Sequence, residues 1–131
     1  MIKENFEKHI VTFFGVINCD LNTMTYVNCS QYPFPIIFHD NKSQFIERTG
    51  NAVDLFSFAQ YQQKEIILPE KFLLTVFSDG ILNSFPTEDT DANTEDLTKL
   101  NSSEKIFNYI SKLKTEKELT GDITVLTINK E

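Results

Sequence analysis

The sequence has few basic residues and no long hydrophobic run, and both absences narrow its function. It contains 12 Lys and Arg residues but 19 Asp and Glu residues, which gives a formal net charge of −7 at pH 7. This balance disfavours a phosphate-backbone binder, because there is no basic surplus to displace counterions from a nucleic acid. No segment approaches the roughly 18–20 apolar residues that cross a bilayer, and the charged N-terminus lacks a signal-peptide core. We therefore expect a cytoplasmic protein without a nucleic-acid or membrane partner.

Cysteine is also scarce, with only Cys19 and Cys29. If residues 20–23 close a hairpin, Cys29 lies on the returning strand, roughly 17 Å from Cys19 at the rise of a β-strand. That separation is beyond the reach of a disulfide. Neither cysteine has a CxxC or histidine partner at zinc-site spacing. We expect both to be small core or strand residues.

What the chain does contain is a series of short apolar segments separated by turn residues. With 131 residues, 40% of them hydrophobic, it is expected to form one domain. Segments rich in β-branched and aromatic residues predict strands, and helical spacing after a serine cap predicts one helix from about Ser103 to Lys117. The predicted strands are 10–18, 24–28, 36–38, 45–47, 64–68, 72–77 and 122–129. Because hairpins dominate, the predicted class is α+β with a mostly antiparallel sheet.

Two segments allow a more specific prediction. Residues 10–18 (IVTFFGVIN) are apolar on both alternating faces, which is typical of a central strand covered on both sides. Residues 87–96 carry five acidic side chains and almost no large apolar residue. They are predicted to form a solvated loop. The alternative, a cation-binding loop, lacks the glycine and the spaced oxygen ligands of an EF-hand.

Asp79 and Asp122 are the candidate metal ligands. Asp79 ends the apolar strand 72–77 and precedes Gly80, which allows close approach of the backbone. Asp122 opens the last predicted strand, so the two acids could converge at one edge of a sheet on Mg²⁺ or Mn²⁺. The alternative for Asp79 is an Asx-type turn in which its side chain caps nearby amides. No nucleophile motif or phosphate-binding glycine loop accompanies these residues, and His39 is expected to be solvated.

The order of four segments resembles the C-terminal part of the metal-dependent protein serine/threonine phosphatases, the PPM family. The most similar branch is that of the bacterial stage-II-sporulation-E-like phosphatases. Strand 72–80 (FLLTVFSDG) is similar to that family's strand ending in Thr-Asp-Gly, and 121–126 (GDITVL) to its strand beginning with Asp-Asp. Two further segments, 6–18 and 26–35, complete the match in the expected order.

This resemblance implies an antiparallel β-sandwich flanked by helices, with two Mn²⁺ or Mg²⁺ ions at one end of the sheets. In the family, these ions activate a water that attacks phosphoserine or phosphothreonine. Asp79 matches a metal-ligand aspartate. Residues 1–131 would form a single partial domain in which the front half, with its Gly-Asp metal motif, is absent.

Several departures from the family pattern weaken the implied site. Gly121 replaces the first aspartate of the Asp-Asp pair, Ser30-Gln31 replaces a Gly-His pair, and Asn83 stands where glutamate is common. One matching aspartate cannot hold two divalent ions, so we expect no stably bound metal and no catalytic residue in this chain alone.

Three functions remain open from the sequence. The first is a degenerate or truncated phosphatase domain that binds a regulatory partner of the anti-sigma-antagonist type in bacterial partner switching. The second is an active phosphatase completed by sequence or a chain outside this one. The third is an unrelated α+β interaction domain in which strands 72–78 and 122–128 would not be adjacent. Exposed sheet edges in a partial domain also predict a homodimer.

Overall fold

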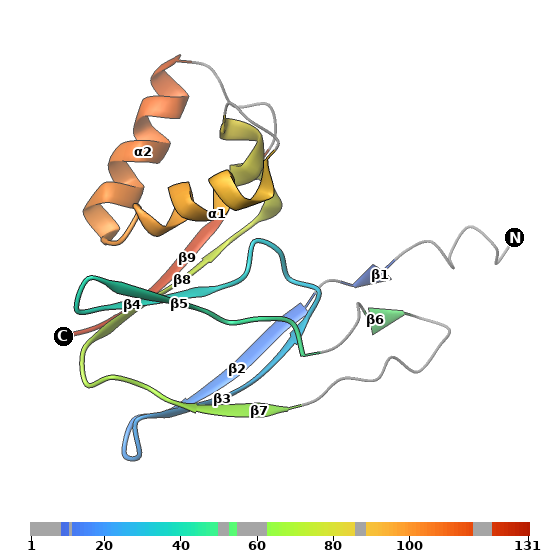
Figure 1. Ribbon diagram of the computed structural model, residues 1–131, viewed down its shortest axis with the longest axis vertical. Coiled ribbons are helices and arrows are strands. Elements are labelled where there is room, and N and C mark those ends of the chain that lie inside the picture. The colour runs from blue at the N-terminus through green and yellow to red at the C-terminus, as the bar shows by residue number, and fades with distance from the viewer. Residues whose placement is uncertain (1–8, 11, 50–52, 55–62, 86–88, 117–121) are drawn as a thin grey trace, which may run out of the picture. The chain divides into compact units, whose positions relative to one another are not determined.

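The computed structural model describes residues 9–10, 12–49, 53–54, 63–85, 89–116 and 122–131 (Figure 1). The chain divides into two compact units. One unit comprises Met1–Gln31 and Ile46–Glu70, and the other comprises Tyr32–Phe45 and Lys71–Glu131. All strand pairs among the described residues are antiparallel. The predicted α+β class is confirmed.

The first unit contains a three-stranded sheet in the order β2-β3-β7. Its strands are β2 (Thr12–Asn18), β3 (Thr23–Cys29) and β7 (Lys64–Ile67). A short pair, β1 (His9–Ile10) with β6 (Val53–Asp54), belongs to the same unit. The hairpin between β2 and β3 turns where the sequence predicted, because the Asn18 side chain accepts hydrogen bonds from the amides of Asp20 (3.0 Å) and Leu21 (3.1 Å).

The position of β2 in this sheet corrects one prediction. Segment 10–18 was expected to be central and covered on both faces. Among the described strands, β2 is instead an outer strand that pairs only with β3. Phe14 and Val16 are 64% and 55% exposed. An apolar pattern on both faces indicates that a strand can be covered twice, but it does not specify which part of a chain supplies the cover.

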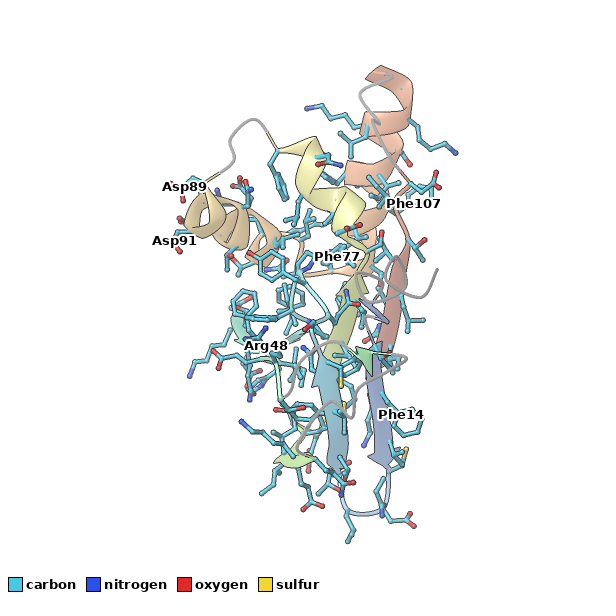
Figure 2. All side chains as sticks on the ribbon, turned by 90° about the vertical axis from the view of Figure 1, so that its right-hand side faces the viewer. Phe14, Arg48, Phe77, Asp89, Asp91 and Phe107 are labelled. Carbon is cyan, nitrogen blue, oxygen red and sulfur yellow. The ribbon has the colours of Figure 1, made fainter. Side chains whose placement is uncertain are left out.

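The second unit is built on a four-stranded sheet in the order β5-β4-β8-β9. Its strands are β4 (Ile36–His39), β5 (Lys42–Phe45), β8 (Phe72–Phe77) and β9 (Val125–Lys130). Helices α1 (Thr90–Thr98) and α2 (Ser103–Glu116) pack on it, and a 3-10 helix spans Asp79–Ser84. Phe77, labelled in Figure 2, is fully buried in a core that joins the strands to Leu97 of α1 and Ile106 of α2.

Two strand boundaries differ from the sequence prediction. The fourth strand was placed at 45–47, but β5 is Lys42–Phe45. It starts earlier because Asp40 and Asn41 both adopt positive φ (49° and 60°), which closes the hairpin within two residues. The last strand was expected from residue 122, but it starts at Val125, after an irregular segment whose Thr124 amide bonds to a side chain.

A solvated loop was predicted for residues 87–96, but residues 90–96 belong to helix α1, and residues 87 and 88 lie outside the described residues. Asp89 caps the helix by accepting hydrogen bonds from the amides of Asp91 (2.9 Å) and Ala92 (3.4 Å). Asn93 and Leu97 are buried on its inner side. One cap and a single large apolar anchor therefore suffice for this helix, although its composition is that of a loop. The one helix that the sequence predicted, from about Ser103 to Lys117, is confirmed as α2.

The cysteine predictions are confirmed in part. Both cysteines are free thiols, as expected. Cys29 is buried at the end of β3, but Cys19 is exposed in the hairpin turn and is not a core residue. Within the described residues, no helix combines the length and the apolar character that crossing a membrane requires.

Candidate functional site

The candidate site is the end of the β8–β9 pair, which we call the β8–β9 rim: residues 78–80 after β8 and residues 122–124 before β9. The two strands pair up to Phe77 and Val125. Beyond that pair, the Ser78 amide donates to the Thr124 carbonyl (2.9 Å), and the Thr124 amide donates to Ser78 Oγ (2.8 Å). Ser78 and Thr124, 46 residues apart in the chain, are thus held side by side. The separation of these strands that the unrelated-domain hypothesis predicts is therefore not found.

Gly80 brings the two segments of the rim into direct backbone contact. A Cβ atom at this position would overlap the carbonyl oxygen of Asp122 and lie 3.0 Å from its carbonyl carbon. Gly80 is itself buried. Only a residue without a side chain fits here, so the glycine after Asp79 has a packing role that fixes the position of the Asp122 backbone.

The carboxylates of Asp79 and Asp122 are both exposed. Asp79 lies in the first turn of the 3-10 helix, whose N-cap, Ser78, makes no side-chain capping hydrogen bond because its Oγ accepts from Thr124. Among the described residues, no hydrogen bond or ion pair involves either carboxylate. The alternative of an Asx-type turn at Asp79 is therefore wrong, and both acids are available to solvent or to a ligand.

The donors at the rim do not fit a two-metal centre. A pair of divalent cations requires several carboxylates, each neutralising part of the charge. In the part of the chain that the structure describes, no three His, Cys, Asp or Glu side chains lie close enough to hold a metal ion. Asn83 in the 3-10 helix is exposed and contributes an amide, not a charge. Gly121 lies outside the described residues. The described part of the rim thus offers two acids, Asp79 and Asp122, which are too few for such a centre.

Ser30 and Gln31, which stand where the family has a Gly-His pair, lie beside a buried hydrogen-bond network in the first unit. Asn28 is fully buried on β3, donates to the Ile46 carbonyl (2.9 Å) and accepts from the Gln31 amide (2.8 Å). Ser30 between them has φ of 66°, a conformation that side chains rarely adopt. This turn is therefore held by the Asn28 side chain.

A second concave site, in the second unit, was not predicted from the sequence. A cavity of about 360 Å³ lies between the β4–β5 hairpin and the α1–α2 junction. Lys42 and Lys105 contribute two ammonium groups, and Thr98 and Asn101 contribute neutral polar groups. The Lys105 ammonium donates to Asn101 Oδ1 (2.9 Å). His39, expected to be solvated, is half-buried at this cavity with Nδ1 3.3 Å from the Asp40 carboxylate.

Comparisons with known proteins agree with this fold. No curated protein matches the sequence. The structure is similar to the phosphatase domain of the cell-fate determinant SpoIIE from Bacillus subtilis, with a TM-score of 0.65, 15% identity and coverage of 92% of this chain and 58% of that one. A Mn-presoaked structure of that domain has a TM-score of 0.66 and 14% identity, and the match covers 92% of this chain and 56% of that one. The RsbU and RsbW domains of a Mycobacterium tuberculosis protein match with a TM-score of 0.56 and 20% identity, over 67% of this chain and 25% of that one.

At these identities the structural matches show the fold alone, and this chain spans less than two thirds of each solved chain. The sequence itself matches the family described as Stage II sporulation protein E (SpoIIE) over residues 1–131. The resemblance inferred from strands 72–80 and 121–126 is therefore confirmed: the chain belongs to the SpoIIE family and has the fold of its PPM-type phosphatase domain.

Proposed function

We propose that this chain is a degenerate SpoIIE-type phosphatase domain that acts as a regulatory protein-binding module in the cytoplasm. The observation that carries the proposal is the donor set of the β8–β9 rim. Asp79 and Asp122 lie on adjacent segments, and the described residues provide no third ligand beside them. A phosphatase of this fold depends on two metals to activate water and stabilise the leaving oxygen. The retained fold without that ligand set favours binding over hydrolysis.

The proposed partner is a small phosphorylatable regulatory domain of the anti-sigma-antagonist type. Membership of the SpoIIE family and structural likeness to an RsbU–RsbW protein support a role in partner switching. The chain carries a net charge of −7, so its few cationic sites are candidates for an anionic ligand. This reasoning favours recognition of the partner's phosphorylated state.

The cavity beside α2 is the part of the second unit that best suits such a partner. Lys42 and Lys105 come from different elements and line the same concavity, where the nearest lining acid, Asp40, lies beside His39. Two ammonium groups and the Asn101 amide can together contact the oxygens of a phosphoryl group. We place the phosphorylated side chain of the partner at this cavity.

Binding to phosphorylated and unphosphorylated forms of such domains tests the proposal. The 131-residue chain should bind at least one of these domains in one phosphorylation state, as measured by calorimetry. It should release no phosphate from the phosphorylated form in the presence of Mn²⁺. Absence of binding in both states, or Mn²⁺-dependent release of phosphate by the chain alone, would contradict it.

A second function is favoured by the exposure of the two rim acids. Within the described ranges, the Asp79 and Asp122 side chains have no partner that would give them a structural role. They could serve as ligands in an active phosphatase whose remaining ligands come from sequence or a chain not included here. Adding a polypeptide that carries the Gly-Asp motif should then produce Mn²⁺-dependent hydrolysis of p-nitrophenyl phosphate, and Asp79→Ala should abolish it.

A further inference from the structure

The outer edge of β2 is unpaired among the described strands and carries none of the usual protection against pairing. Of the strands that the structure describes, only β3 pairs with β2, on its other side. The strand Thr12–Asn18 (TFFGVIN) contains no charged residue and no proline. Natural proteins place lysine, proline or bulges on exposed edges because an edge presents free amide and carbonyl groups to any strand that approaches. As far as residues 9–10, 12–49, 53–54, 63–85, 89–116 and 122–131 show, this edge is open to the addition of a further strand.

The register of the sheet shows which side chains would meet at that edge. Phe14 lies opposite Val27, and Val16 lies opposite Thr25, so these four share one face of the sheet. Thr25 Oγ1 bonds to Glu65 on the same face (3.4 Å). Phe14 and Val16 are more than half exposed, and Figure 2 shows Phe14 projecting from β2. Phe13 and Ile17 lie on the opposite face, with Tyr26 and Met24.

The pattern of apolar and polar side chains in β2 is symmetric about Gly15. On one side of the glycine the order is aromatic, aromatic, polar, and on the other side it is aliphatic, aliphatic, polar. If two copies of β2 pair antiparallel with Gly15 opposite Gly15, Phe14 lies opposite Val16, Phe13 opposite Ile17, and Thr12 opposite Asn18. Aromatic residues opposite β-branched residues are favourable cross-strand pairs. Each such pair occurs twice across the two-fold axis.

From this symmetry we propose that a second copy of this chain pairs with β2 through a two-fold seam centred on Gly15. A two-fold interface requires a surface that is complementary to itself, and the strand sequence meets this condition. The chain carries seven net negative charges, yet no charge would face its copy across the seam. The dimer would join two three-stranded sheets into one six-stranded sheet. This inference is independent of the proposed function.

Charge pairs across the seam test both the dimer and its register. Phe14→Lys with Val16→Lys places lysine opposite lysine twice, and it should weaken dimerisation of the 131-residue chain roughly tenfold or more in sedimentation velocity. Phe14→Lys with Val16→Glu places each introduced lysine opposite an introduced glutamate of the second copy, and dimerisation should return. Both positions are exposed, so the fold should tolerate these changes, and circular dichroism checks it.

A matched control and a cross-link complete the test. Ile67→Lys lies on the same sheet but on β7, is 83% exposed, and should leave dimerisation unchanged. In a Cys19→Ser background, Gly15→Cys should form an intermolecular disulfide on mild oxidation, because opposed strand residues lie about 4.5–5.5 Å apart at Cα. A monomeric wild-type chain would overturn the proposal. So would equal dimerisation of the lysine–lysine and lysine–glutamate variants, or no disulfide in a dimer.

Discussion

Gly80 and Asp122 are in direct backbone contact, so that a side chain on the glycine would overlap the aspartate carbonyl oxygen. Together with the Ser78–Thr124 hydrogen bonds, this contact joins the end of β8 to the segment before β9. The segments that carry the exposed Asp79 and Asp122 therefore meet in one rim. Backbone and Ser78 contacts hold them together without a ligand.

Gly80→Ala should destabilise the protein. The new methyl group would meet backbone atoms of Asp122, which cannot move without breaking the Ser78–Thr124 pairing. Overpacking of this kind costs about 1–3 kcal/mol. Urea unfolding followed by circular dichroism measures the change. Gly15→Ala is the control, since its nearest contact would be Met24 Sδ at an ordinary 3.5 Å, and the free energy of unfolding should change by less than about 1 kcal/mol.

Asp89→Ala should destabilise helix α1. The Asp89 carboxylate accepts the Asp91 and Ala92 amides, and losing an N-cap typically costs about 1 kcal/mol. Hydrogen exchange of the α1 amides, compared with those of α2, should show the loss locally. Asp89→Asn keeps a capping oxygen and should retain most of the protection. Equal loss in both variants would mean that charge at this position, and not capping, supports the helix.

The phenol of Tyr26 should titrate above its ordinary range. Burial raises the pKa of Tyr26 above 10.0, and the nearby Glu47 carboxylate raises this pKa further. Because the raised pKa favours the neutral phenol in the folded state, its contribution to stability is complete below pH 10 and decreases as the pH rises through the folded pKa. Ultraviolet titration at the tyrosinate absorbance measures this. Glu47→Gln should lower the Tyr26 pKa only in part, since burial remains.

Lys42→Glu with Lys105→Glu should weaken binding of a phosphorylated partner. Both ammonium groups line the cavity beside α2, so reversing them removes the proposed contacts to a phosphoryl group. We expect a loss of roughly three- to tenfold for each lysine, because exposed charge pairs contribute little individually. Lys64→Glu, in the other unit, changes the net charge in the same way as each single variant and should have little effect. Equal losses of affinity in the single variants Lys42→Glu, Lys105→Glu and Lys64→Glu would indicate a general charge effect.

The sequence predicted the parts of the fold that local pattern determines. Strand β8 is apolar on both faces and ends at a Ser-Asp-Gly turn, and α2 has a regular apolar stripe, so both were located correctly. Helix α1 was missed because its acidic composition outweighed the capping signal of Asp89. The exposure of β2 was missed because a strand's own sequence does not show which neighbours cover it.

The candidate site, too, was predicted from the sequence only in part. Short motifs at strand ends predicted that Asp79 and Asp122 lie at one edge of a sheet, and antiparallel pairing of β8 with β9 brings those ends together. Their role as metal ligands stays a prediction. The cavity with Lys42 and Lys105 could not be assigned, because it joins a hairpin turn to a helix more than 60 residues later in the chain. No local motif marks such a site.

Calorimetric titration of the 131-residue chain with Mn²⁺ tests the central claim most directly, namely that the rim holds too few carboxylates for a two-metal centre. We predict no saturable binding of two ions per chain and no difference between the wild type and Asp79→Ala. Binding of two Mn²⁺ per chain, lost in Asp79→Ala and accompanied by hydrolysis of p-nitrophenyl phosphate, would contradict the account.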